Sequence, residues 1–557
     1  MTLEDRLDGW GRGWRGPLLA AAVAMIAGLP GLIAVPPLDR DEARFAQASA
    51  QMLESGDFVT IHFQDAPRFK KPVGIYWLQA AAVATLSHVE DREIWAWRIP
   101  SLLGAMLAAA ACAWGAGAFL APRGALMAGV MLGASILLST EAAIASTDAV
   151  LCGATTLALA ALGRVYLAGR GGPSAGWRSK ALFWLGLALS VLVKGPIGPM
   201  VVALTLVALG LWERRVAWLR ELGWGWGLIL LLAAVGPWAM AITVATDGAF
   251  WGASIGGDLA PKLLGDQEGH GGLPGFYLLL APLLLFPACL LVPAGAITAW
   301  RARAEPAVRF ALCWLVPSWL VFEAAPTKLV HYTLPLYGAL AWLMARALAE
   351  PVGRASRVAG AVLVGFAAAA FAAAGPLAMA WLHDWTGMAW GWAAAVLFLA
   401  AGGAAAVQLL SARPTRAVAA GVALTLLAHG VFAAALVPAL RPLWLSSRAA
   451  KALAAAGLSP SQGIAPGPVT VAGYEEPSVV FLLGTPTLLG DANDAAEAIA
   501  EGRPAIVEGR LDGAFHAALA GAGVTALRVG EGAGLDYSNN RSDILRIYRP
   551  PPERISP

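Results

Sequence analysis

Two short polar segments near the start of the chain carry residue types that bind phosphate and move protons. The first, residues 39–44, combines acids with arginines: Asp39, Arg40, Asp41, Glu42 and Arg44. The second, residues 67–72, carries three cations: Arg68, Lys70 and Lys71. Lysine as a compact point charge and arginine as a planar fork both suit a lipid phosphate. A carboxylate beside them could act as a general base, or stabilise positive charge developing on a sugar carbon.

Later segments add ionisable residues where long apolar runs begin or end. Asp148 opens one run, and Lys194 stands in a Lys-Gly-Pro sequence between two others. The segment 326–332 contributes Lys328, His331 and Tyr332. A longer polar stretch, residues 247–273, contains Lys262, Asp266, Glu268 and His270. Short polar segments that recur in this way are hard to attribute to solubility alone. We therefore expect several of them to line one cavity.

Each of these residues also has a structural interpretation. The segment around Asp41 could be a solvated loop, and Lys194 could extend along an apolar surface to reach water. Asp148 could be a residue favoured at a helix start by the helix dipole. Histidines such as His270 and His331 are more often loop or core residues than metal ligands. The residues alone leave these alternatives open.

The composition identifies the environment in which these segments act. Hydrophobic residues make up 58% of the 557-residue chain and charged residues only 13%, and the mean hydropathy is +0.65. Soluble proteins carry about a quarter charged residues. The apolar runs are long enough to cross a bilayer. The four cysteines fall inside apolar runs without metal-type spacing, as small buried residues do. The chain is therefore expected to be a polytopic membrane protein.

Thirteen membrane spans account for the apolar runs. They are predicted at 17–36, 95–119, 123–140, 148–168, 180–193, 196–212, 223–246, 274–299, 307–323, 329–348, 356–381, 388–410 and 416–440. The run 73–88 is short and follows a charged loop, so we expect it to lie along the membrane surface instead. It belongs to a first outer loop of residues 37–94, and residues 247–273 form another outer loop.

The basic residues support this count and give the orientation. Short loops rich in Lys and Arg stay in the cytoplasm. With the N-terminus inside, it and every even-numbered connection are basic, including those with Arg123, Arg170, Arg309 and Arg346. Counting 73–88 as a span would break this pattern. The candidate residues then share the outer, periplasmic face of a bacterial inner membrane. An odd number of spans places the C-terminal segment there too.

The composition changes near residue 444 and predicts a second domain. Residues 1–443 form the transmembrane domain, and residues 444–557 form a soluble α/β domain of roughly 110 residues, enough for one core. Short strands are expected at 469–472, 505–508, 525–529 and 544–548, and amphipathic helices at 493–500 and 513–522.

A series of motifs resembles a known family. The segments are Asp41-Glu42-Ala43-Arg44-Phe45, 52–58, 71–77, Thr147-Asp148, Lys194-Gly195-Pro196 and 328–332. They are similar, in the same order, to motifs of the bacterial protein-O-mannosyltransferase-like family, which includes the aminoarabinose–lipid A transferases. The resemblance covers roughly residues 17–350. It implies the large C-type glycosyltransferase fold, with interfacial helices in the first outer loop and a polyprenyl-phosphate sugar donor.

The resemblance also implies roles for individual residues. Asp41 matches the family's catalytic aspartate, whereas Asp39 has no counterpart and is expected to tolerate replacement by Asn. Residues expected to hold the donor phosphate are Arg44, Lys71, Lys194 and Tyr332. Further residues expected in the cavity are Glu42, Asp148, His270, Lys328 and His331. Asp148 matches an acid that can share a metal with a carboxylate before the family lysine. Lys70 stands there instead, so a divalent cation is left open.

The expected activity is transfer of a sugar from undecaprenyl phosphate to an acceptor at the outer leaflet, with lipid A as the leading candidate. The alternative acceptors are a protein or another envelope glycan, and no nucleic-acid partner is expected. A transporter for a lipid-linked sugar is the main rival. Transporters, however, tend to place ionisable residues near the middle of the membrane. Here the polar motifs gather on one side.

Overall fold

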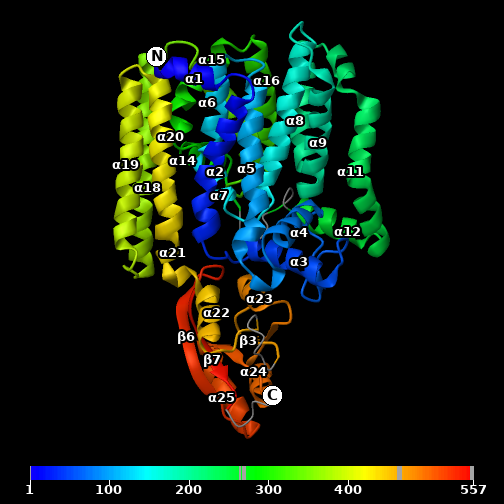
Figure 1. Ribbon diagram of the computed structural model, residues 1–557, viewed down its shortest axis with the longest axis vertical. Coiled ribbons are helices and arrows are strands. Elements are labelled where there is room, and N and C mark those ends of the chain that lie inside the picture. The colour runs from blue at the N-terminus through cyan, green and yellow to red at the C-terminus, as the bar shows by residue number, and fades with distance from the viewer. Residues whose placement is uncertain (1, 262–264, 266–270, 461–466, 552–557) are drawn as a thin grey trace.

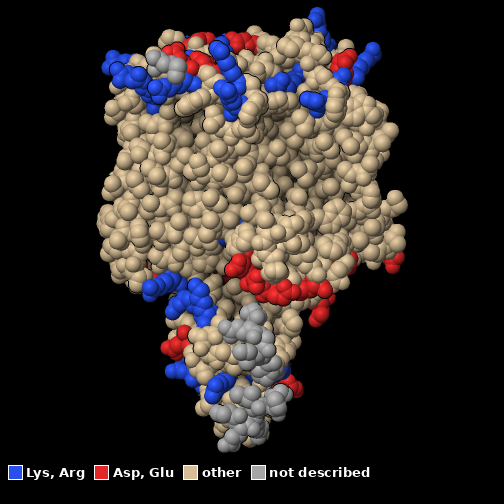
Figure 2. Space-filling view, in the orientation of Figure 1, with Lys and Arg blue, Asp and Glu red and all other residues tan. Residues whose placement is uncertain are grey.

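The computed structural model describes residues 2–261, 265, 271–460 and 467–551, and it consists of a helical bundle with a smaller domain below it (Figure 1). The N-terminus lies at one end of the bundle, and the smaller C-terminal domain lies at the other. On the face drawn in Figure 2, a broad band between these ends is almost free of charged side chains. The chain is a multi-pass membrane protein.

Long apolar helices build the bundle. Those that meet the length and composition of a membrane span are α2 Arg15–Ala34, α5 Ile94–Ala116, α8 Asp148–Ala168, α11 Trp224–Ala245, α16 Pro306–Ala324, α18 Arg354–Leu382, α19 Met388–Leu410 and the span Pro414–Ala439, which comprises α20 Pro414–Val431 with its continuation. These are eight in the described chain, or nine if one bent pair is a single span. Shorter or more polar helices include α9 Gly176–Lys194, α10 Ile197–Glu213 and α17 Tyr337–Ala347. The count of thirteen stays a prediction.

Two predicted spans are broken where the chain cannot continue a straight helix. The run 274–299 forms α14 Phe276–Leu284 and a second segment, Ala288–Arg301, which includes α15 Val292–Arg301, bent from it by 114°. Pro287 stands in the break, and proline removes a backbone donor and obstructs the preceding turn. The run 123–140 forms α6 Pro122–Gly133 and α7 Ile136–Glu141, separated by Ala134 and Ser135.

The first outer loop forms a layer at the end of the bundle that faces the C-terminal domain (Figure 1). It contains α3 Asp41–Ser55, a hairpin of β1 His62–Phe63 and β2 Ala66–Pro67, and α4 Gly74–Leu86. Helix α4 is the segment predicted to lie along the membrane surface. It packs against α3, α5 and α9. The loop is thus folded onto the bundle and can present side chains to it.

The segments predicted to be cytoplasmic meet at the opposite end of the bundle, where Figure 2 shows many basic side chains. Arg123 forms an ion pair with Glu4 of α1 Leu3–Trp10. Arg170 and Arg309, from two different connections, both pair with Glu213. Contacts between connections far apart in sequence agree with their predicted placement on one side.

The C-terminal domain is a mixed five-stranded sheet with helices on both faces. The strand order is β4-β3-β5-β7-β6, with β4, β3 and β5 parallel and β7 antiparallel to both β5 and β6. The strands are β3 Thr470–Ala472, β4 Leu488–Gly490, β5 Ala505–Glu508, β6 Leu527–Asp536 and β7 Arg541–Arg549. Strands β3, β5, β6 and β7 overlap the four predicted strands, and β4 was not predicted. The connection between β6 and β7 is a tight turn.

Alternation along the strands explains the layers of this domain. Val471, Ile506 and Ile547 pack with α22 Leu445–Ala455 and α23 Pro477–Leu483. Neighbouring positions on the same strands, such as Val507, pack on the other face with the two predicted helices, found as α24 Ala492–Ala500 and α25 Asp512–Gly521. Side chains of a strand point alternately to its two faces, so each face has its own core.

Candidate active site

A cavity of about 340 Å³ lies where the first outer loop covers the bundle. Its ionisable lining residues are Arg40, Asp41, Arg44, Arg68, Lys70, Lys71, Glu141, Asp148, Lys194, Asp258, His331 and Tyr332. The structure therefore brings together residues from six distant segments, and most of the predicted site residues are among them. Apolar side chains, including Leu151, Ile197 and Phe322, line the same cavity. Such a mixed lining suits a charged group attached to an apolar chain.

Asp41 and Arg44 stand on the first turn of α3 and reach the cavity from the same helix end. Acidic residues in a first turn interact favourably with the helix dipole, and Gly56 ends the helix in a left-handed conformation. The Asp41 side chain is 72% exposed, and its Oδ1 lies 3.9 Å from Nη2 of the buried Arg68. An exposed carboxylate at the wall of a cationic cavity is available to a substrate.

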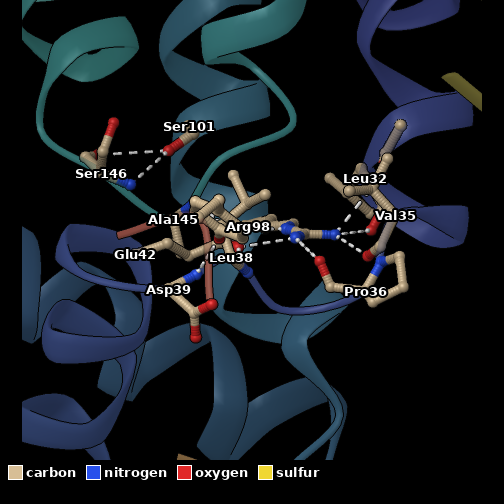
Figure 3. A network of polar contacts seen from close by, with 12 residues as sticks. Leu32, Val35, Pro36, Leu38, Asp39, Glu42, Arg98, Ser101, Ala145 and Ser146 are labelled. Atoms are coloured by element: carbon tan, nitrogen blue, oxygen red, sulfur yellow. Dashed lines mark hydrogen bonds and ion pairs between the residues drawn. The ribbon is translucent and has the colours of Figure 1, made fainter. Parts of the chain in front are cut away.

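Glu42 points away from the cavity into the protein, where it binds Arg98 of α5 (Figure 3). The guanidinium makes two hydrogen bonds to the carboxylate, Nε–Oε1 at 2.8 Å and Nη2–Oε2 at 2.7 Å. The carboxylate also accepts from the backbone N–H groups of Leu38 and Ala145. Remaining Arg98 protons go to carbonyls such as that of Val35. Glu42 thus holds the Asp41 segment against α5 and against the chain at Ala145, and it is not among the lining residues of the cavity.

The two predicted phosphate-binding lysines face carboxylates in this structure. Lys71 Nζ lies 2.5 Å from Oδ2 of Asp258, in the segment Gly252–Leu259. Lys194, the last residue of α9, lies 2.6 Å from Oδ1 of Asp148. Its Nζ also stands 5.5 Å from the centre of the Tyr332 ring, so Lys194 and Tyr332 share one wall of the cavity. Asp258 lies in the polar stretch 247–273, from which the sequence analysis selected other residues.

Three side chains in the cavity could share a divalent cation. Nδ1 of His331 lies 3.4 Å from Glu141 Oε1, and Nε2 lies 3.7 Å from Asp148 Oδ2. One ligand atom from each of the three residues lies within 4.8 Å of the others. Two carboxylates and an imidazole are a donor set that suits a transition metal. A metal here would use Glu141, which follows the predicted span 123–140, in place of the acid replaced by Lys70.

Two further predicted residues are not placed in the cavity. Lys328 is buried, and its ammonium donates to the carbonyls of Glu323 and Ala325 at 2.6 and 2.8 Å. It therefore holds the end of α16 and is not among the cavity's lining residues. His270 lies outside the described residues.

The balance of charge in the cavity favours an anion. Six basic side chains line it against four acidic ones. Arg44, Arg68, Lys71 and Lys194 come from three separate segments of the chain, and each can contact a phosphate in the cavity. The exposed Asp41 stands on the wall formed by the first outer loop. The arrangement can hold a lipid phosphate while a carboxylate acts at the group attached to it.

Comparisons with known proteins give this arrangement a context. The model of the family described as dolichyl-phosphate-mannose-protein mannosyltransferase matches residues 35–249. Undecaprenyl phosphate-alpha-4-amino-4-deoxy-L-arabinose arabinosyl transferases from Pseudomonas paraeruginosa and Pseudomonas aeruginosa are 29% and 30% identical to the chain. The family resemblance is confirmed. The aligned parts cover 57% and 56% of this chain, and the chain spans 57% and 55% of the length of these relatives.

Comparison with solved structures confirms the fold. The crystal structure of ArnT from Cupriavidus metallidurans bound to undecaprenyl phosphate matches with a TM-score of 0.75 and 20% sequence identity. The match covers 95% of this chain and 97% of that one. The apo state of the same protein gives a TM-score of 0.74 at 21% identity. The C-type glycosyltransferase fold predicted from the motifs is therefore correct.

Proposed function

We propose that this chain transfers a sugar from undecaprenyl phosphate to an acceptor at the outer leaflet of the inner membrane, with lipid A as the leading acceptor. The observation that carries the proposal is the cavity, which is lined by several cationic side chains and by the exposed carboxylate of Asp41. The resemblance to arabinosyl transferases that use an undecaprenyl-phosphate donor supports it.

Phosphate binding and catalysis divide among the residues as follows. Arg44, Lys71 and Lys194 hold the donor phosphate, and the apolar lining takes the start of the polyprenyl chain. An acceptor oxygen forms a bond to the anomeric carbon, while the bond from that carbon to the phosphate oxygen breaks. Undecaprenyl phosphate leaves with the electron pair. Phosphate is a good leaving group, so positioning and electrostatics carry most of the rate enhancement.

Asp41 acts on the acceptor side of this reaction. A hydroxyl acceptor must lose its proton as it attacks, and Asp41 takes that proton as a general base. A phosphate acceptor is already an anion, so Asp41 then orients the sugar and stabilises the positive charge on the anomeric carbon. A divalent cation at Glu141, Asp148 and His331 would add positive charge for binding phosphate.

Replacement of Lys71 by Ala is expected to raise the donor KM about tenfold or more, because a hydrogen bond to a charged group is worth about 1.5–3 kcal/mol. Steady-state transfer measured against donor concentration checks this. Lys180→Ala is the matched control, since Lys180 pairs with the exposed Glu221 at the opposite end of the bundle. Equal donor dependence in the two variants would remove Lys71 from the phosphate site.

The orientation of the protein gives a second expected result. A reporter that is active only in the cytoplasm, fused to the end of the full chain, should be silent, because the basic connections hold the opposite end inside. A periplasmic reporter at the same position should be active. Cytoplasmic activity at that position would place the cavity on the wrong face for an outer-leaflet acceptor.

The acceptor can be identified in cells. Mass spectrometry of lipid A and of the other envelope glycans, from a deletion strain and its complemented parent, should show one sugar missing from lipid A. Loss of a sugar from a protein or another glycan would instead support the alternative acceptors. If the deletion strain instead accumulates the lipid-linked sugar on the cytoplasmic side and no acceptor loses a sugar, the protein is a transporter.

A further inference from the structure

The C-terminal domain contacts the backbone that leads directly into Asp41. The backbone N–H of Asp39 donates to the Tyr537 hydroxyl at 2.7 Å, and the Arg40 guanidinium donates to the carbonyl of Ser538. Tyr537 and Ser538 form the turn between β6 and β7. The Asp39 carboxyl group also contacts the hydroxyl of Ser478, near the start of α23. Two parts of the C-terminal domain thus bind residues that are 439 and 498 positions away in the sequence.

The backbone held by these contacts is strained. Arg40 precedes the first turn of α3 with φ 61° and ψ −112°. A side chain makes a positive φ costly, on the order of 1–3 kcal/mol, whereas glycine adopts it freely. Gly195 in the same protein has nearly the same angles, φ 59° and ψ −122°. Where glycine is absent, surrounding contacts must maintain such a conformation. At Arg40 those contacts come from the C-terminal domain.

The C-terminal domain also forms hydrogen bonds with later residues of α3. Gln47 donates to the hydroxyl of Thr485 at 2.7 Å, and that hydroxyl donates to Glu54 at 2.6 Å. Phe481 packs edge-on against Trp97 of α5, with ring centres 5.0 Å apart. The C-terminal domain is therefore held against α3 at Gln47 and Glu54, and the turn between β6 and β7 is held against the two residues that precede the helix.

We propose that the turn between β6 and β7 is a positioning element of the active site, which holds the strained Asp39–Arg40 backbone so that Asp41 faces the substrate. The inference rests on the proposed function, since it assigns Asp41 the catalytic role. It gives the C-terminal domain a part in catalysis although the domain's sheet lies outside the bundle. It also revises the expectation that Asp39 tolerates replacement by Asn, because Asp39 contacts the C-terminal domain that positions Asp41.

The carboxyl group of Asp39 makes this contact sensitive to pH. Ser478 has one hydroxyl proton and lies in hydrogen-bond contact with both Asp39 and Ser446. The Asp39 carboxyl group accepts the hydrogen bond from Ser478. Burial raises the pKa of Asp39 to about 7, with the hydrogen bond from Ser478 opposing it. The other titratable or charged groups around it are Arg40, Arg44, Tyr474, Glu476, Asp536 and Tyr537.

The sign of the pH effect follows from the raised pKa. When the C-terminal domain is docked on the Asp39–Arg40 segment, the Asp39 carboxyl group keeps its proton up to about pH 7. When the domain is undocked, the same carboxyl group has its ordinary pKa of 3.8 and releases the proton at lower pH. Docking is therefore strongest below pH 3.8 and weakens as the pH rises through about 7. Above that pH the Asp39 carboxylate also repels Glu476 and Asp536.

Replacement of Tyr537 by Phe tests the proposal, because it removes the hydroxyl that accepts from the Asp39 backbone and little else. The kcat should fall about tenfold or more, since small misplacements of catalytic groups cost up to about a hundredfold. The donor KM should stay within about twofold, because the phosphate-binding residues are untouched. Tyr548→Phe is the matched control: its hydroxyl donates to Asp512 within the C-terminal domain. An equal kcat per folded molecule in the two variants overturns the proposal.

A second measurement does not depend on activity. Hydrogen exchange of the backbone amides in residues 39–44 should be faster in Tyr537→Phe than in Tyr548→Phe, and unchanged exchange overturns the positioning role. If exchange is faster while the parent protein transfers no sugar, the proposed function fails and the structural contact stands. In an active protein, Asp39→Asn should keep kcat near its pH 6 value up to pH 8, while the parent's kcat declines. Parallel pH profiles would contradict a role for Asp39.

Discussion

Replacement of Asp41 by Asn is expected to lower the rate of sugar transfer by about two orders of magnitude or more, the usual cost of removing a positioned acid–base group. The substitution keeps the size of the side chain and removes its charge. Asp41 is 72% exposed and its nearest ion-pair contact is 3.9 Å long, so folding should change by less than about half a kcal/mol. Donor lipid should still bind, because the cationic side chains remain.

The control for this variant must be an acid of the same loop without a structural role. Asp39 does not qualify, because it contacts Ser478 and its backbone contacts Tyr537. Asp65 is exposed at the turn of the β1–β2 hairpin, and Asp65→Asn should leave transfer unchanged. Single-turnover transfer at saturating donor separates the chemical step from binding. Near-parental rates in Asp41→Asn would place the active site elsewhere.

Replacement of Arg98 by Met is expected to destabilise the protein by about 3–5 kcal/mol, the usual cost of breaking a buried ion pair on one side. Arg98 is fully buried and the Glu42 side chain is 1% exposed. Without the guanidinium, the Glu42 carboxylate has no compensating charge, and several carbonyls lose their donor (Figure 3). Unfolding of the purified protein in detergent measures the loss.

Two comparisons separate this effect from a general loss of arginine. Arg123→Met removes the partly exposed pair with Glu4 and should cost less than about 1 kcal/mol. The double variant Arg98→Met with Glu42→Gln should recover part of the loss, because it removes the unpaired charge while the single amide oxygen still accepts from one of the two backbone N–H groups, that of Leu38 or that of Ala145. A cost for Arg98→Met no larger than that for Arg123→Met would contradict the anchoring role of this pair.

Much of the fold followed from the sequence because hydropathy and charge act over short distances. The ends of α3, α8 and α9 lie where Asp41, Asp148 and Lys194 interrupt apolar sequence. Motif order then indicated that these ends meet in one cavity. Breaks inside apolar runs were harder to predict, since packing decides whether a proline such as Pro287 kinks a helix or ends it.

Two residues missed by the sequence analysis, Arg98 and Glu141, are single charges inside or directly beside predicted spans. Arg98 lies inside a predicted span, where an ionisable group needs a partner. Glu42 lies close enough to the membrane surface to supply one, and this pairing could have been inferred. Glu141 and Asp258 gave no such signal. The contact between Tyr537 and Asp39 depends on the docking of two domains, which local sequence does not encode.

The most direct test of the account is transfer by the purified protein from a synthetic undecaprenyl-phosphate-linked sugar to lipid A. Mass spectrometry would count the released undecaprenyl phosphate and the modified lipid A in the same reaction. Equal amounts of both products are expected, formed by the parent protein and lost in Asp41→Asn, while both proteins bind the donor lipid. Equal product formation by the two proteins, or no transfer to any outer-leaflet acceptor, would contradict the account.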